Sequence, residues 1–177
     1  MAATEEMLDI ARLARPDAVT LVAERPDEIT TEGGLDVKSN KASVSNAVNA
    51  IRESGILASL FIDPEPAQIE VAQQVGAQQV ELCTAAYSDA MLGARGMHGE
   101  GAMRARQELQ RLREGAELAA QYGLLVAAGH GLTYRNVGDV AAIEEIIEFN
   151  IGHNIVARAI FVGLETAVKE MRTAIGR

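Results

Sequence analysis

Two histidines beside glycines are the side chains of this sequence best suited to chemistry. His130 lies between Gly129 and Gly131 in the segment GHGLTY, directly after the apolar run LLVAA, and His153 follows Gly152 in NIGHN. Imidazole titrates near neutral pH, so a histidine in an open glycine turn can act as a general acid or base. The alternative is that backbone hydrogen bonds hold His130 in its turn and that the residue takes no part in catalysis.

Gly152 and His153 stand between a predicted strand and the last predicted helix. The free amides and the dipole at a helix N-terminus attract anions, and glycine lets a phosphate approach the backbone closely. We therefore expect a phosphate-binding pair here. The simpler interpretation is a glycine turn with an exposed histidine.

Two further segments carry polar residues at or just after predicted strands, as the histidine segments do. Glu81 lies in QQVELCT, between Val80 and Leu82. A carboxylate that points among apolar residues needs a partner or a raised pKa. The alternation also fits a half-exposed strand, with Val80 and Leu82 inward and Glu81 in water. The residues alone slightly favour this second interpretation. The segment TTEGGLD, which begins at Thr30, either cradles a ligand or forms a capped turn, and it lacks the Gly-Lys-Ser/Thr ending of a P-loop.

The elements that must position these residues alternate between strand and helix. Strands of the buried type are expected near residues 18, 56, 78, 124 and 147, which predicts a parallel sheet with right-handed crossovers. Ligands of such sheets lie outside the carboxyl ends of the strands, where the polar residues above are found. The last helix is expected to run from about Asn154 to Thr173, with a shared apolar face made of Val156, Ile160, Leu164, Ala167, Val168 and Met171.

Composition narrows the class of protein. The chain has 177 residues, 48% of them hydrophobic and 23% charged, with no linker-like segment, so we expect one globular domain over residues 1–177. The net charge of −9 argues against nucleic acid and anionic membranes as partners. Neither a membrane span nor a signal peptide is apparent, and the single Cys83 excludes an internal disulfide, which together predict a cytoplasmic protein.

Five segments, taken together and in order along the whole chain, resemble the pyridoxine 5'-phosphate synthase family. They are EITTEGGLDV, SLFIDPE, VELCTAAY, AAGHGLTYRNV and EFNIGHNIVARAIFVGL. The resemblance implies a (β/α)8 TIM barrel, a homo-octamer and a transferase-type synthase of vitamin B6 biosynthesis. The implied reaction condenses 1-deoxy-D-xylulose 5-phosphate with 3-amino-2-oxopropyl phosphate, releases phosphate and water, and uses no metal or organic cofactor.

The resemblance also implies a role for each candidate residue. His130 matches a general acid, and Glu81 matches a carboxylate that stabilises the transition state, which reverses the interpretation of Glu81 as a solvated residue. Thr30 and Gly131 match substrate contacts. Gly152 and His153 match a phosphate-binding pair.

The number of predicted strands departs from a complete barrel. Five strands cannot close an eight-stranded barrel, and such barrels typically run about 250 residues. The resemblance implies two strand-helix units and most of a third strand before Met1, with further histidines, an arginine and a glutamate, whereas this chain has only His98, His130 and His153. We therefore expect an incomplete barrel with little or no activity on its own. The alternatives are a non-catalytic remnant that binds phosphate or joins a full-length partner, and, with less support from the matched segments, a different phosphate-binding barrel enzyme.

Overall fold

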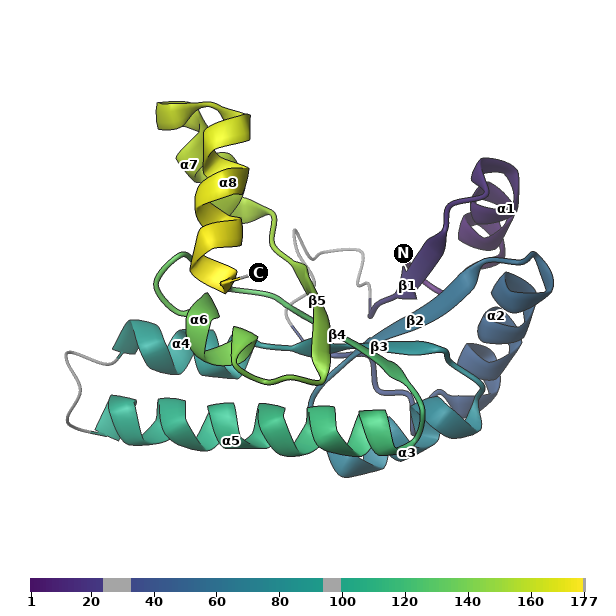
Figure 1. Cartoon of the computed structure of the whole chain (residues 1–177). Coiled ribbons are helices and arrows are strands. Elements are labelled where there is room, and N and C mark those ends of the chain that lie inside the picture. Colours follow the sequence, from purple (N-terminus) through teal and green to yellow (C-terminus); the bar gives the residue numbers. More distant parts are fainter. Residues whose placement is uncertain (24–32, 94–99, 177) are drawn as a thin grey trace.

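The fold is built around a parallel five-stranded sheet. The computed structural model describes residues 1–23, 33–93 and 100–176 (Figure 1). The strands in this part of the chain are β1 (Ala18–Leu21), β2 (Leu57–Ile62), β3 (Gln79–Cys83), β4 (Leu125–Gly129) and β5 (Ile146–Asn150). They lie side by side in sequence order, and every pair of neighbours is parallel.

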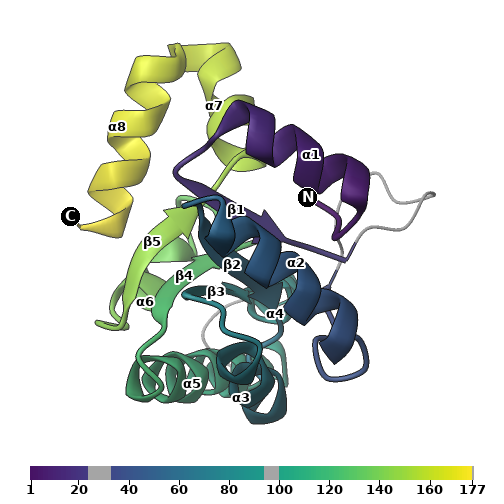
Figure 2. The same cartoon turned by 90° about the vertical axis from the view of Figure 1, so that its right-hand side faces the viewer.

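Helices precede, separate and follow the strands along the chain. They are α1 (Glu5–Ala14), α2 (Lys41–Glu53), α3 (Pro66–Gln74), α4 (Ala85–Gly93), α5 (Glu100–Gln121), α6 (Val137–Ala141), α7 (His153–Val162) and α8 (Leu164–Ile175). The helices α2, α3 and α5 cover one face of the sheet, whereas α1 stands beyond β1 and the α7–α8 pair stands beyond β5 (Figure 1). Figure 2 shows α3 and α5 packed side by side below the sheet.

The two faces of the sheet differ in polarity. The residues that point to the helices are apolar and fully buried, as Leu60, Val80 and Leu82 are. Because side chains alternate along a strand, the residues between them point to the opposite face. That face carries Thr20, Ser59, Phe61, Gln79, Glu81, Cys83, Ala127, Gly129, Glu148 and Asn150, as the pairing register indicates.

This arrangement is that of a TIM-barrel-like α/β fold, as the sequence predicts. A doubly wound sheet reverses its strand order and carries helices on both faces, whereas here the order never reverses and one face is polar and free of the strand-connecting helices α2, α3 and α5. Within the described ranges, no helix is long and apolar enough to cross a membrane.

The C-terminal helix expected from about Asn154 to Thr173 is two helices. Gly163 adopts φ 81° and ψ 155°, outside the helical region, and separates α7 from α8. The helix α8 then folds back along α7, which brings the Arg158 guanidinium to the Glu170 carboxylate, with two hydrogen bonds at 2.7 and 3.0 Å. One straight helix would separate these two residues by about 18 Å.

The prediction of one shared apolar face along that helix is therefore wrong. Ala167 and Met171 of α8 are buried against the rest of the fold. Val156, Ile160 and Leu164 are 60%, 79% and 62% exposed, because the reversal at Gly163 turns them away from that core.

Candidate functional site

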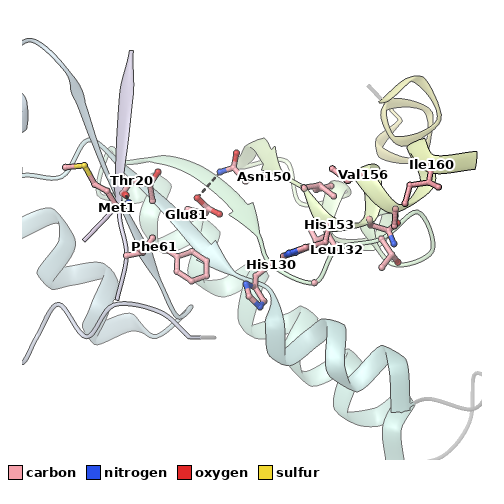
Figure 3. A pocket seen from close by; sticks show the side chains of 17 residues that line it. Met1, Thr20, Phe61, Glu81, His130, Leu132, Asn150, His153, Val156 and Ile160 are labelled. Carbon is pink, nitrogen blue, oxygen red and sulfur yellow. Dashed lines mark hydrogen bonds between the residues drawn. The ribbon is translucent and has the colours of Figure 1, made fainter. Parts of the chain in front are cut away.

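An open cavity of about 1130 Å³ lies at the carboxyl ends of the strands (Figure 3). Five of the six residues selected from the sequence line it: Glu81, His130, Gly131, Gly152 and His153. The sixth, Thr30, lies outside the described residues, and so does His98. The other walls of the cavity include Met1, Thr20, Phe61, Asn150, Val156 and Ile160.

The turn that carries His130 is fixed through its backbone. The buried Thr84 hydroxyl lies 2.8 Å from the carbonyl oxygen of Gly129 and 2.5 Å from that of His130, and the Thr84 amide donates to the Gly129 carbonyl at 2.8 Å. His130 has φ 86°, a left-handed conformation that side chains other than glycine rarely adopt. Its imidazole lies beside Phe61, with the ring centroids 6.2 Å apart. Backbone hydrogen bonds thus hold the turn, as the alternative interpretation of His130 supposes, while the imidazole lines the cavity.

Asn136 holds the second half of this turn. Its Oδ1 accepts a hydrogen bond from the Thr133 amide at 2.6 Å, and its Nδ2 donates to the Gly131 carbonyl at 3.3 Å. A Cβ at Gly131 would lie 2.7 Å from the Cβ of Ser88. Gly131 is therefore required by close packing under the turn, in addition to its φ of 76°.

Glu81 is half buried and faces the open cavity, so the interpretation of a strand with Glu81 in water holds only in part. Val80 and Leu82 pack under the helices, as that interpretation expected, but the opposite face of the sheet is the cavity wall. Asn150 Nδ2 donates to Glu81 Oε2 at 2.8 Å (dashed line in Figure 3). Burial raises the pKa of Glu81 above its usual value, the hydrogen bond from Asn150 lowers it, and the nearby charge of Glu148 raises it.

Gly152 and His153 begin the helix α7. Gly152 is the N-cap residue, and the first helical bond runs from the Val156 amide to the Gly152 carbonyl at 3.0 Å. The backbone amides of the first turn of α7 have no acceptor within the helix, which makes them available to an anion. Gly152 and His153 are exposed, and no described atom lies within 4 Å of a Cβ built at Gly152. A ligand can thus approach this backbone from the cavity.

Cys83 and the acidic residues offer little for metal chemistry. Burial raises the pKa of the Cys83 thiol to about 11, so the thiol of this buried residue is protonated. Among the described residues, no group of three or more His, Cys, Asp or Glu side chains is arranged to hold a metal ion.

The sequence did not single out Asn150, Asn136 or Phe61. Asn150 stands two residues before Gly152 and could have been noticed as a polar residue at the end of a predicted strand. Asn136 acts locally, on Thr133 and Gly131, within a turn that the sequence analysis took only as the setting of His130. The contribution of Phe61 depends on a contact with His130, far away along the chain, for which no local pattern exists.

The fold and this cavity define a TIM-barrel-like α/β protein with an open cavity at the carboxyl ends of its strands. Residues 1–177 match the family described as pyridoxal phosphate biosynthesis protein PdxJ. The chain belongs to the PdxJ family, which confirms the resemblance seen in the sequence.

Curated relatives agree with this family. The chain is 52% identical over 176 residues to a pyridoxine 5'-phosphate synthase of Synechococcus sp., covering 99% of this chain and 70% of the relative. It is 50% identical over 175 residues to the protein of that name from Prochlorococcus marinus, with 99% and 67% covered. The protein of that name from Syntrophotalea carbinolica is 45% identical over 176 residues, with 99% and 70% covered. The chain spans about two thirds of the length of the curated relatives it matches, between 66% and 70% for those compared.

Proposed function

We propose that the chain forms the C-terminal part of a pyridoxine 5'-phosphate synthase. The reaction is the condensation of 1-deoxy-D-xylulose 5-phosphate with 3-amino-2-oxopropyl phosphate to pyridoxine 5'-phosphate, phosphate and water. The observation that carries the proposal is that Glu81, His130, Gly131, Gly152 and His153, separated by up to 72 positions, line one cavity. The names of the relatives add support.

In this proposal His130 and Glu81 act on the reacting atoms. The imidazole of His130 gives a proton to the departing hydroxyl group in a dehydration step, and the fixed turn keeps it at the cavity wall. The carboxylate of Glu81 stabilises positive charge that develops on the condensing amine, in a partly buried site where such an interaction is strong. Gly131 lets substrate lie against the backbone, and Thr30 is a further substrate contact implied by the resemblance.

Gly152 and His153 hold a substrate phosphate at the start of α7. The Gly152→Ala variant tests this, because its Cβ would stand in open space and leave the fold undisturbed. We expect the affinity for inorganic phosphate, measured by calorimetry, to fall about tenfold while the unfolding temperature stays the same. Gly138→Ala is the matched control, since its Cβ would make only an ordinary contact of 3.7 Å with the Ala174 carbonyl. Equal phosphate affinity in both variants would remove the phosphate site from the proposal.

The proposal includes further strand-helix units before Met1 that complete the barrel between β1 and β5. Met1 lies beside β1 in the manner of a parallel strand: its ammonium donates to the Thr20 carbonyl at 2.8 Å, and its carbonyl accepts from the Val22 amide at 3.0 Å. Large apolar side chains beyond both edges of the sheet, such as Leu13 and Ile160, are 88% and 79% exposed and would gain cover. A homo-octamer in the cytoplasm, implied by the resemblance, belongs to the same proposal.

An assay of turnover tests both the synthase activity and the incompleteness of the barrel. The purified chain is compared with a fusion to the additional segment of the Synechococcus relative, using both substrates and detecting pyridoxine 5'-phosphate by mass spectrometry. We expect little or no product from the chain alone, product from the fusion, and almost none from a His130→Ala fusion. Full activity of the chain alone would refute the incomplete barrel. A folded fusion that binds phosphate without forming product would favour the non-catalytic remnant.

A further inference from the structure

The Glu81 carboxylate is held on two sides by residues outside the reaction proposed above. Asn150 Nδ2 donates a hydrogen bond to Oε2 at 2.8 Å. Oε1 lies against the backbone of Gly129, where a Cβ would be only 2.5 Å away. Any side chain at position 129 would therefore displace the carboxylate from its present place.

The register of the sheet explains how a β3 side chain reaches β5. Glu81 is level with Ala127 of β4, whereas Asn150 is level with Gly129, one inward position further along. The Glu81 side chain crosses β4 diagonally to meet Asn150, because the inward residues of β4 are small. The Gln79 amide makes the same kind of bridge to the Glu148 carboxylate, at 3.2 Å.

We propose that Asn150 is a positioning residue for Glu81: its amide, admitted by the missing side chain at Gly129, orients the carboxylate toward the cavity and favours its ionised form. A carboxylate that stabilises developing positive charge must be ionised and fixed before the reaction begins. The inference rests on the role proposed above for Glu81.

The surroundings of Glu81 both raise and lower its pKa. Burial, the largest influence, raises the pKa of Glu81, and the negative charge of Glu148 on β5 raises it further. The Met1 ammonium beside β1 lowers it, but less than the hydrogen bond from Asn150 does. His130 and His153 line the same cavity, and the neighbouring Cys83 thiol is protonated. The hydrogen bond from Asn150 is thus the strongest influence that favours the ionised carboxylate.

The titration of Glu81 tests this directly. Isotope-edited infrared spectroscopy of protein labelled at glutamate carboxyl groups follows ionisation, and a Glu81→Gln variant identifies the signal of Glu81. We expect Asn150→Ala to move the titration midpoint of Glu81 upward by about one pH unit, the value of one lost hydrogen bond to a charged group. Asn150→Asp, which keeps the shape of the side chain, should move it at least as far, because it removes the donor and adds a like charge.

Gln110→Ala is the matched control. It removes a hydrogen bond of 2.9 Å from an amide to the Glu114 carboxylate on the exposed side of α5 and should leave the Glu81 midpoint unchanged. An unchanged midpoint in folded Asn150→Ala and Asn150→Asp, even with a lower unfolding temperature, would overturn the proposal, because a merely structural role moves stability alone.

This titration requires no turnover, so it is independent of the synthase assay. If the fusion protein forms no product, the proposed function fails while the upward movement of the midpoint is still expected. In an active fusion, Asn150→Ala should lower kcat about tenfold with little change in KM and move the acid limb of the pH profile upward. Unchanged kcat and an unmoved acid limb would refute the positioning role.

Discussion

Replacing Gly131 by alanine tests how the turn around His130 is supported. Gly131 has φ 76°, where a residue with a Cβ loses about 1–2 kcal/mol. The added Cβ would also lie 2.7 Å from the Cβ and 2.9 Å from the Oγ of Ser88, which is buried in α4. Overpacking of a buried contact adds about 1–3 kcal/mol. We therefore expect Gly131→Ala to lower the free energy of unfolding by about 2–5 kcal/mol.

Gly123→Ala is the matched control for the backbone conformation. Gly123 has φ 75°, and its Cβ would have no described atom within 4 Å. It should therefore lose only the conformational part, about 1–2 kcal/mol. Urea denaturation of both variants with a common m-value measures the difference. Equal losses in the two variants would refute the argument from packing under the turn.

A double-mutant cycle identifies the obstacle as Ser88. Ser88→Gly removes the Cβ that the methyl group added at position 131 would meet, at a cost of about 1 kcal/mol for a glycine in a helix. Combined with Gly131→Ala it should recover stability, so that the two changes couple by about 1–3 kcal/mol. Additive losses would show that another contact causes the effect.

Three further outcomes follow from the described side chains. Hydrogen bonds from Ser39 and Gln68 lower the pKa of Asp36 from 3.8 to about 2, so they stabilise the fold above pH 3.8 and lose this effect as the pH falls to about 2. Asp36→Asn should be less stable than the wild type near neutral pH in urea, and a gap that stays constant in strong acid would contradict this. Burial raises the pKa of Glu81 above its usual 4.5, so the wild type should lose stability relative to Glu81→Gln as the pH rises through that raised pKa; thermal unfolding that shows a constant difference would count against it. Thr84→Val should cost about 1–3 kcal/mol in urea, because the buried hydroxyl that lies between the Gly129 and His130 carbonyl oxygens is lost, while the Thr84 amide still donates to Gly129. No measurable loss would mean that water replaces the hydroxyl.

The parallel direction of the strands and the edge of the sheet that carries the site were predictable because both follow from local patterns. Short apolar strands separated by helical segments require crossovers, and parallel strands bring their carboxyl ends to one edge. The residues that follow those ends, His130 and His153 among them, had to meet there.

The surroundings of Glu81 could not be predicted from alternation. Alternation in QQVELCT separates two faces, but it does not say whether the polar face meets water or the interior of a barrel. That distinction depends on α7 and on the turns after β4 and β5, which stand over the polar face and line the cavity with Glu81. The break at Gly163 was equally hidden, because the apolar spacing on either side of it continues as if one helix ran through.

The small side chains of β4 account for how the site is assembled. As a sequence, LLVAAG reads as an apolar strand and Gly129 as half of a glycine pair around His130. In the structure, Gly129 and Gly131 are required for different reasons. Gly131 takes a left-handed turn over Ser88, so a side chain there disturbs the turn. Gly129 leaves room for the Glu81 carboxylate and for the backbone of Asn150, at 2.5 and 2.8 Å from the position of a Cβ. A substitution at Gly129 must therefore disturb the carboxylate first, and β4 contributes to the chemistry mainly by keeping that space open between β3 and β5.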